Sequence, residues 1–203
     1  MKRAVIFDYG GVLMKTVDYT PRDNWDQRLG LPPGRVEQIV HGSASWVQAQ
    51  CGEITLQEYW ADIAQQLGLG ETETQALALD FYRGDRLDRV LIQYIQELRA
   101  ANYTVALLSN APTTLASDLQ ALGIAHLFNP LVISAHIGVM KPDPRAYQAV
   151  LEALGRPAAH TIFVDDVPAN VQAAAALGIH GVHYRADMDL RAALEPLLDF
   201  TFE

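Results

Sequence analysis

The stretch Arg3-Ala4-Val5-Ile6-Phe7-Asp8-Tyr9-Gly10-Gly11-Val12-Leu13 carries the pattern that decides the fold. Its residues 4–7 form an unbroken apolar run, which is typical of a strand buried on both faces of a parallel sheet. The run ends in one carboxylate, Asp8, at the point where open α/β sheets bind their ligands. The two glycines that follow let the backbone take a positive φ and approach a ligand closely. The stretch therefore predicts a ligand site, although a plain strand-to-turn transition with a solvated Asp8 gives the same local pattern.

The composition is that of an ordinary globular protein. The chain has 203 residues, of which 50% are hydrophobic and 19% charged, and this length fits one domain with a modest insertion. The formal net charge is −9, and no run of Lys and Arg is present. This argues against a nucleic-acid partner, which needs a basic surface. An acidic protein can still bind phosphate through a local feature such as a metal ion, a lysine or backbone N–H groups.

Cysteine usage and hydropathy bear on the compartment. Cys51 is the single cysteine, so no intramolecular disulfide can form, which fits a reducing environment. The apolar run that starts at residue 4 is too short for the core of a signal peptide. No stretch approaches the length of a membrane span. We therefore expect a cytoplasmic protein with no membrane partner; the sequence leaves open whether it is a monomer or a homodimer.

Two kinds of pattern divide the chain. Residues 15–87 carry helical spacing and chain breakers, including the capping-box pair Thr55 and Glu58, but no convincing buried strand. After residue 88, apolar strands expected at 103–108, 131–134, 161–164 and 180–184 alternate with amphipathic helices. Such alternation predicts a parallel sheet covered on both faces. The predicted fold is α/β: a Rossmann-like core of residues 1–14 and 88–203, with an all-helical cap domain, residues 15–87, over the carboxyl edge of its sheet.

Polar residues stand at the ends of the expected strands. Asp8 ends the first strand, Ser109 and Asn110 follow the next, and Asp165 and Asp166 follow the fourth. The carboxyl ends of parallel strands meet at one edge, so these side chains should converge there. Lys141, just past the third strand, should join them.

The chemistry that suits this set is phosphoryl transfer with magnesium. Mg²⁺ is usually held by one or two carboxylates together with substrate phosphate and water, and Asp8 and Asp165 can supply the carboxylates. Close carboxylates repel each other, and a divalent cation keeps both ionised. Lys141 can offset negative charge, while the Ser109 hydroxyl and nearby N–H groups can bind phosphate oxygens. Asp8 can then attack phosphorus and form an aspartyl-phosphate that water hydrolyses.

The segments FDYGGVL (7–13), LLSNAP (107–112), GVMKPDP (138–144) and FVDD (163–166) resemble, in order and spacing, the four motifs of the haloacid-dehalogenase-like (HAD) hydrolase superfamily. The resemblance covers essentially the whole chain and implies the HAD fold, a Mg²⁺ cofactor and a small phosphate ester as substrate. It implies the following site residues: Asp8 as nucleophile, Ser109 as phosphate binder, Lys141 as charge stabiliser, Asp8, Asp165 and the Gly10 carbonyl as metal ligands, and Asp166 as an indirect metal ligand. Asn110, which should support the loop around Ser109, and Gly11 are further candidates for phosphate or substrate binding.

The chain departs from the family's phosphatases at position 10. Their second residue after the nucleophile is usually an Asp that acts as general acid and base, which is worth roughly 10²–10⁴-fold in rate. Gly10 cannot move a proton. A good leaving group, an acid from the cap or the substrate, or weak or absent catalysis would each accommodate the glycine. The chain resembles a phosphatase subgroup with glycine here, which includes the α-glucose-1-phosphate phosphatases.

Three functions remain open on these residues. The leading hypothesis is a Mg²⁺-dependent phosphatase acting on a small phosphorylated metabolite such as a sugar phosphate. The second is a non-catalytic or weakly active phosphate-binding protein, and the third is a 2-haloacid dehalogenase, in which the pair Asp165-Asp166 would have no obvious purpose. Substrate choice should come from the cap, where His41 and Ser43 are the candidates for substrate binding; a loop or surface role fits His41 equally well.

Overall fold

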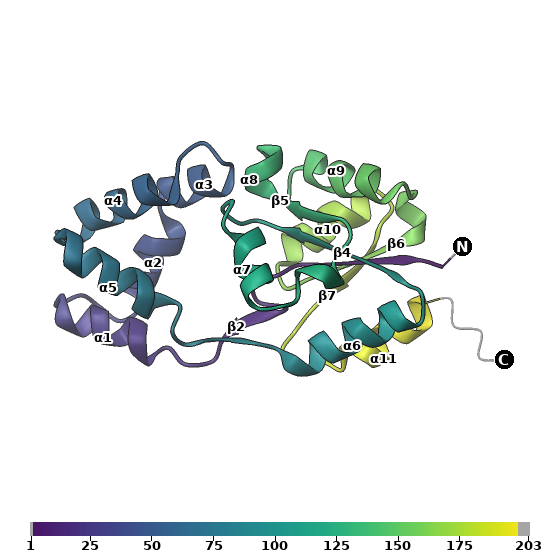
Figure 1. Ribbon diagram of the computed structural model, residues 1–203, viewed down its shortest axis with the longest axis horizontal. Coiled ribbons are helices and arrows are strands. Elements are labelled where there is room, and N and C mark those ends of the chain that lie inside the picture. The colour runs from purple at the N-terminus through teal and green to yellow at the C-terminus, as the bar shows by residue number, and fades with distance from the viewer. Residues whose placement is uncertain (1, 199–203) are drawn as a thin grey trace.

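The computed structural model describes residues 2–198, so Met1 and residues 199–203 of the predicted core domain lie outside the described residues. A five-stranded parallel sheet forms the centre of the fold (Figure 1). Its strands lie in the order β5 (Leu131–Ile133), β4 (Thr104–Ser109), β1 (Ala4–Phe7), β6 (Thr161–Asp165) and β7 (His180–His183). The first strand of the chain thus lies in the middle of the sheet. The predicted α/β class and parallel sheet are confirmed.

Helices cover both faces of the sheet. Successive side chains of a strand point to opposite faces, so each strand contributes to the packing on both sides. Val5 and Phe7 of β1 pack into one apolar cluster, while Ile6 packs into another. The first cluster is covered by α6 (Arg89–Ala100), α7 (Leu115–Ala121) and α11 (Leu190–Leu194), and the second by α9 (Pro144–Leu154) and α10 (Pro168–Ala176). The short elements are α8 (Ser134–Ile137) and the 3-10 turns Ala125–Leu127, Ala158–His160 and Glu195–Leu197. Burial on both faces explains why β1 is apolar throughout.

Five helices stand apart from the sheet and occupy the left of Figure 1. We call them the helical insertion: α1 (Thr20–Arg28), α2 (Arg35–Gly42), α3 (Ala44–Gln50), α4 (Leu56–Leu67) and α5 (Glu71–Phe81). They enclose an apolar cluster of their own, which includes Tyr59 and Phe81. The predicted capping box is present at the start of α4, where the Thr55 hydroxyl accepts from Glu58 N at 3.2 Å and the Glu58 carboxylate accepts from Thr55 N at 2.7 Å. No helix within residues 2–198 is long and apolar enough to cross a membrane.

The sequence pattern does not predict helix α1. Its sequence is Thr-Pro-Arg-Asp-Asn-Trp-Asp-Gln-Arg, in which Trp25 is the one large apolar side chain, so the spacing of an amphipathic helix is missing. Polar contacts fix it instead. The buried Asp26 carboxylate accepts from Gly34 N at 2.6 Å and from Val36 N at 2.7 Å, which ties α1 to the start of α2.

The two segments that join the helical insertion to the sheet pair with each other. β2 (Met14–Thr16) and β3 (Asp85–Leu87) form a two-stranded antiparallel sheet, with Lys15 opposite Arg86. The helical insertion is therefore attached to the sheet by two adjacent strands. An ion pair of 2.7 Å between Lys15 on β2 and Asp88 just after β3 reinforces this attachment.

Candidate active site

Strand ends bring the predicted residues together around one lysine. Lys141 is 2% exposed, and its Nζ lies 2.7 Å from Asp8 Oδ1, 2.7 Å from Asp165 Oδ2 and 3.0 Å from the carbonyl oxygen of Leu108. These acceptors lie at the ends of β1, β6 and β4. The three N–H groups of the ammonium therefore each have an acceptor on a different one of three neighbouring strands. The strand-end pattern predicts this convergence. The catalytic roles of the residues stay predictions.

Burial makes the charge of Asp8 depend on its neighbours. Asp8 is 7% exposed, and burial raises the pKa of its carboxyl to about 6; the Lys141 ammonium opposes that rise, and the Asp165 carboxylate adds to it. An attacking carboxylate must be ionised, so positive charge beside Asp8 is required for nucleophilic chemistry. Lys141 supplies part of this positive charge, but its ammonium also pairs with the Asp165 carboxylate.

The Asp165 carboxylate is occupied by hydrogen bonds. Its Oδ1 accepts from Val167 N at 2.8 Å, its Oδ2 accepts from Lys141, and the Asn170 side-chain amide lies 3.1 Å from each oxygen. Asn170 is buried in the first turn of α10 and is not among the predicted site residues. Its position in the first turn of the helix that follows β6 is the sequence signal that places it at this strand end.

A third carboxylate completes an acidic cluster. One oxygen each of Asp8, Asp165 and Asp166 lie within 4.8 Å of one another. Burial, and then the neighbouring Asp165 carboxylate, raise the pKa of Asp166. These hard oxygen donors fit Mg²⁺, and the excess negative charge that Lys141 leaves uncompensated would be neutralised by a divalent cation.

Gly11 makes room for the third carboxylate. A Cβ at position 11 would lie 2.0 Å from Asp166 Oδ2, and Gly11 has a φ of +75°. Both the backbone conformation and the close approach therefore require glycine here. This gives Gly11 a structural role that is independent of its predicted role in phosphate binding.

Gly11→Ala is expected to lower the free energy of unfolding by about 1–2 kcal/mol through left-handed backbone strain alone. Displacement of the Asp166 carboxylate adds to this loss and should also weaken Mg²⁺ binding. Urea unfolding and Mg²⁺ titration calorimetry measure the two effects. Gly10→Ala is the matched control, because Gly10 does not have a positive φ and a Cβ there has nothing within 4 Å. Equal unfolding energies for the two variants would contradict the account of Gly11.

Ser109 and Asn110 lie at the carboxyl end of β4. Ser109 is the last residue of the strand and is buried. The Asn110 side chain pairs with the backbone of Lys141: its Nδ2 donates to Lys141 O at 2.8 Å, and its Oδ1 accepts from Lys141 N at 2.8 Å. The segment after β4 and the lysine segment are thus fixed to each other. Whether Ser109 and Asn110 bind phosphate remains a prediction.

Gly10 lies beside the nucleophile candidate and is exposed. Since a Cβ at this position meets no atom within 4 Å, packing does not require glycine there. The missing acid is therefore a chemical feature of the site and not a steric necessity.

The two residues predicted for substrate binding in the insertion take part in its packing. The His41 ring lies 5.3 Å from the Trp46 ring and 5.0 Å from the Phe81 ring, measured between centroids, and burial among these rings lowers its pKa to about 4. Part of the His41 residue surface stays exposed. The Ser43 hydroxyl caps α3 by accepting from Trp46 N at 3.1 Å. Both side chains thus have a structural use, and a substrate contact remains a prediction.

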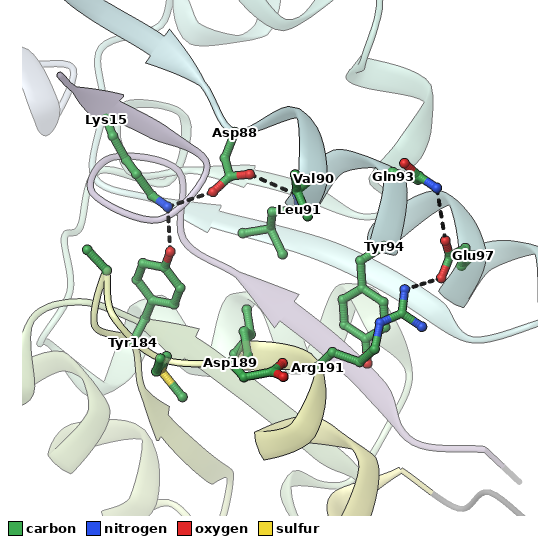
Figure 2. A pocket seen from close by; sticks show the side chains of 13 residues that line it. Lys15, Asp88, Val90, Leu91, Gln93, Tyr94, Glu97, Tyr184, Asp189 and Arg191 are labelled. Carbon is green, nitrogen blue, oxygen red and sulfur yellow. Dashed lines mark hydrogen bonds and ion pairs between the residues drawn. The ribbon is translucent and has the colours of Figure 1, made fainter.

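A separate pocket of about 440 Å³ lies beside Lys15 of β2 and Asp88, between α6 and the segment around α11 (Figure 2). Lys15 reaches it from β2 and contacts both Asp88 and the Tyr184 hydroxyl. Arg191 at the other side contacts Glu97. Within the described part of the chain, the lining of this pocket includes none of the carboxylates of the acidic cluster and not Lys141. It is therefore distinct from the candidate active site.

Known proteins resemble this chain in sequence and fold. Residues 2–178 match the haloacid dehalogenase-like hydrolases. A sesquiterpene phosphatase of Aspergillus oryzae is 32% identical over 185 residues, 89% of this chain and 89% of that protein. A phosphatase of Mycobacterium tuberculosis is 30% identical over 183 residues, 87% of this chain and 84% of that protein. A HAD family enzyme of Bacteroides thetaiotaomicron, solved with magnesium and inorganic phosphate, has a TM-score of 0.79 at 21% identity over 95% of this chain and 99% of that chain. This chain therefore belongs to the haloacid dehalogenase-like hydrolase family.

Proposed function

We propose that this protein is a Mg²⁺-dependent phosphatase that hydrolyses a small phosphorylated metabolite, such as a sugar phosphate, through an aspartyl-phosphate on Asp8. One observation carries the proposal: the buried Lys141 ammonium is shared by Asp8 and Asp165 at an edge where Asp166 adds a third carboxylate. The two phosphatase relatives support it, and so does the neighbouring structure with magnesium and phosphate.

Asp8, Asp166 and the backbone carbonyl of Gly10 would hold the Mg²⁺, which supplies polarisation of the phosphate oxygens. The hydrogen bonds to Asp165 favour this choice, because both of its oxygens already accept from Val167, Lys141 or Asn170. Asp165 then orients Lys141 rather than contacting the metal directly. This exchanges the roles of Asp165 and Asp166 that the family resemblance implies.

The reaction has two displacements at phosphorus. An Asp8 oxygen attacks phosphorus, and the bond from phosphorus to the leaving oxygen breaks. That oxygen takes up a proton from the cap, the substrate or the solvent, since Gly10 cannot supply one. Lys141 offsets the negative charge of Asp8 and the phosphate, while the Ser109 hydroxyl and N–H groups at Asn110 and Gly11 hold phosphate oxygens. Water then attacks phosphorus and releases a proton to the solvent, the bond from phosphorus to Asp8 breaks, and inorganic phosphate leaves.

The helical insertion is proposed to act as the cap. Residues 15–87 would form the cap domain, and residues 1–14 and 88–203 the core domain. The separate apolar cluster of the insertion and the pairing of β2 with β3 support this division. His41 and Ser43 remain the candidates in the cap for contact with the leaving group.

A panel of sugar, aryl and alkyl phosphates, each assayed with and without Mg²⁺, tests the proposal by release of inorganic phosphate. We expect Mg²⁺-dependent release from at least one member and none after chelation. If the protein matches an Asp8→Asn control on every substrate, the phosphatase proposal fails. Calorimetric binding of phosphate or Mg²⁺ without turnover would then favour the binding protein, and metal-free halide release from a 2-haloacid would favour the dehalogenase.

A further inference from the structure

We propose that Gln50, at the end of α3 in the helical insertion, is a positioning residue for Lys141 and acts through Asn110. The proposal rests on the phosphatase function, because it assigns Gln50 a task in arranging that site. Gln50 is buried, although glutamine is ordinarily a surface residue. It is far from the catalytic lysine in sequence and was not among the predicted site residues.

Two hydrogen bonds connect Gln50 to segments that adjoin the parallel sheet. The Gln50 side-chain amide donates to the carbonyl oxygen of Asn110 at 2.8 Å. The hydroxyl of Ser134, itself 1% exposed, donates to the backbone carbonyl of Gln50 at 2.6 Å and accepts from Ala111 N at 2.9 Å. Gln50 is therefore bound to the segment that follows β4 and to the start of α8.

The backbone after Gln50 is fitted to the same surface. Gly52 has a φ of +72°, and a Cβ there would lie 2.3 Å from the carbonyl oxygen of Ala135 in α8. Any other residue would push the α3–α4 turn away from α8. The contact at Gln50 is thus part of a close backbone approach, and not an isolated surface hydrogen bond.

The hydrogen bonds continue from Gln50 to the reacting groups. The carbonyl of Asn110 receives the Gln50 amide, and the Asn110 side chain makes two bonds of 2.8 Å to the backbone of Lys141. The Lys141 ammonium in turn contacts Asp8 and Asp165. The three bonds at Asn110 are partly buried, and the loss of one partner there leaves a polar group that is shielded from water unsatisfied. Docking of the helical insertion and placement of the catalytic ammonium are consequently linked.

Gln50→Glu tests the link, since it keeps the shape of the side chain but places a carboxylate oxygen against the Asn110 carbonyl. We expect kcat for phosphate release to fall about 10-fold with KM changed less than about 3-fold, as for a group that acts on the reaction rather than on substrate binding. We also expect hydrogen exchange at the Lys141 amide to accelerate about 10-fold. Gln48→Glu is the matched control, because Gln48 is exposed on the same helix. Gln50→Met removes the donor without adding charge and should behave like Gln50→Glu.

A double-mutant cycle tests the route through Asn110. In an Asn110→Ala background, Gln50→Glu should change kcat by less than about 2-fold, because the connection to Lys141 is already broken. Additive effects, or Gln50 variants that match Gln48→Glu in both kcat and Lys141 amide exchange, would overturn the proposal. Absence of hydrolysis in the unmutated protein would instead refute the phosphatase function, and the exchange measurement would still decide the positioning by Gln50.

Discussion

Asp8→Asn is expected to abolish phosphate release, with a loss on the order of 10⁴-fold or more, while the fold is kept. The substitution preserves the size of the side chain, and its amide oxygen can still accept from Lys141. It removes the ionised oxygen that would attack phosphorus, so no aspartyl-phosphate forms. It also removes one of the three carboxylates that lie within 4.8 Å of one another. Steady-state phosphate release with Mg²⁺ and thermal unfolding measure the two parts of this prediction.

Asp187→Asn is the control for Asp8→Asn, since it makes the same chemical change at a carboxylate that is 85% exposed. Its activity should stay within about 2-fold of the unmutated protein. Rapid acid quenching during turnover should trap a phosphoryl group on the unmutated protein and on Asp187→Asn, but not on Asp8→Asn. Activity of Asp8→Asn within 10-fold of the unmutated protein would exclude Asp8 as the nucleophile.

The sheet could be predicted from the sequence because its three central strands, β4, β1 and β6, are largely apolar and buried on both faces. Residues 4–7 need no distant information to be recognised as a buried strand, and helices between such strands imply parallel order. The polar helix α1 and the single turn α8 could not be predicted, because neither has a long apolar stripe. The pairing of β2 with β3 also depends on two segments far apart in the chain. Their short, half-buried sequences carry no signal of their own.

The site could be predicted as a set of residues but not as a set of contacts. Parallel strands deliver Asp8, Ser109 and Asp165 to one edge whatever their side chains do. The roles proposed for Asp165 and Asp166 rest on which of the two carboxylates Asn170 and Lys141 bind, and no sequence spacing predicts that. Gln50 is harder still, since its partner is a backbone carbonyl in a distant segment and any residue type has one.

Gly10→Asp is expected to raise turnover of alkyl phosphates by about 10²-fold, at the low end of what general acid catalysis contributes. The gain should depend on the leaving group. An alkoxide leaves poorly unless it is protonated, whereas an aryl oxide needs little help, so we expect less than about 3-fold for an aryl phosphate. The structure permits the change, because a Cβ at position 10 meets no atom within 4 Å and the backbone there does not have a positive φ.

Gly10→Asn separates proton transfer from the other effects of a side chain at position 10. It has nearly the shape of Asp and cannot act as an acid, so it should leave alkyl phosphate turnover within about 3-fold of the unmutated protein. A gain confined to Gly10→Asp and to poor leaving groups would mean that nucleophile, lysine and carboxylates are all competent and only the proton donor is missing. Loss of turnover on both substrate classes would mean that the open space at Gly10 is used by the substrate. In that case the glycine would be a determinant of substrate choice, and the leaving group would be one that departs without an acid from this position.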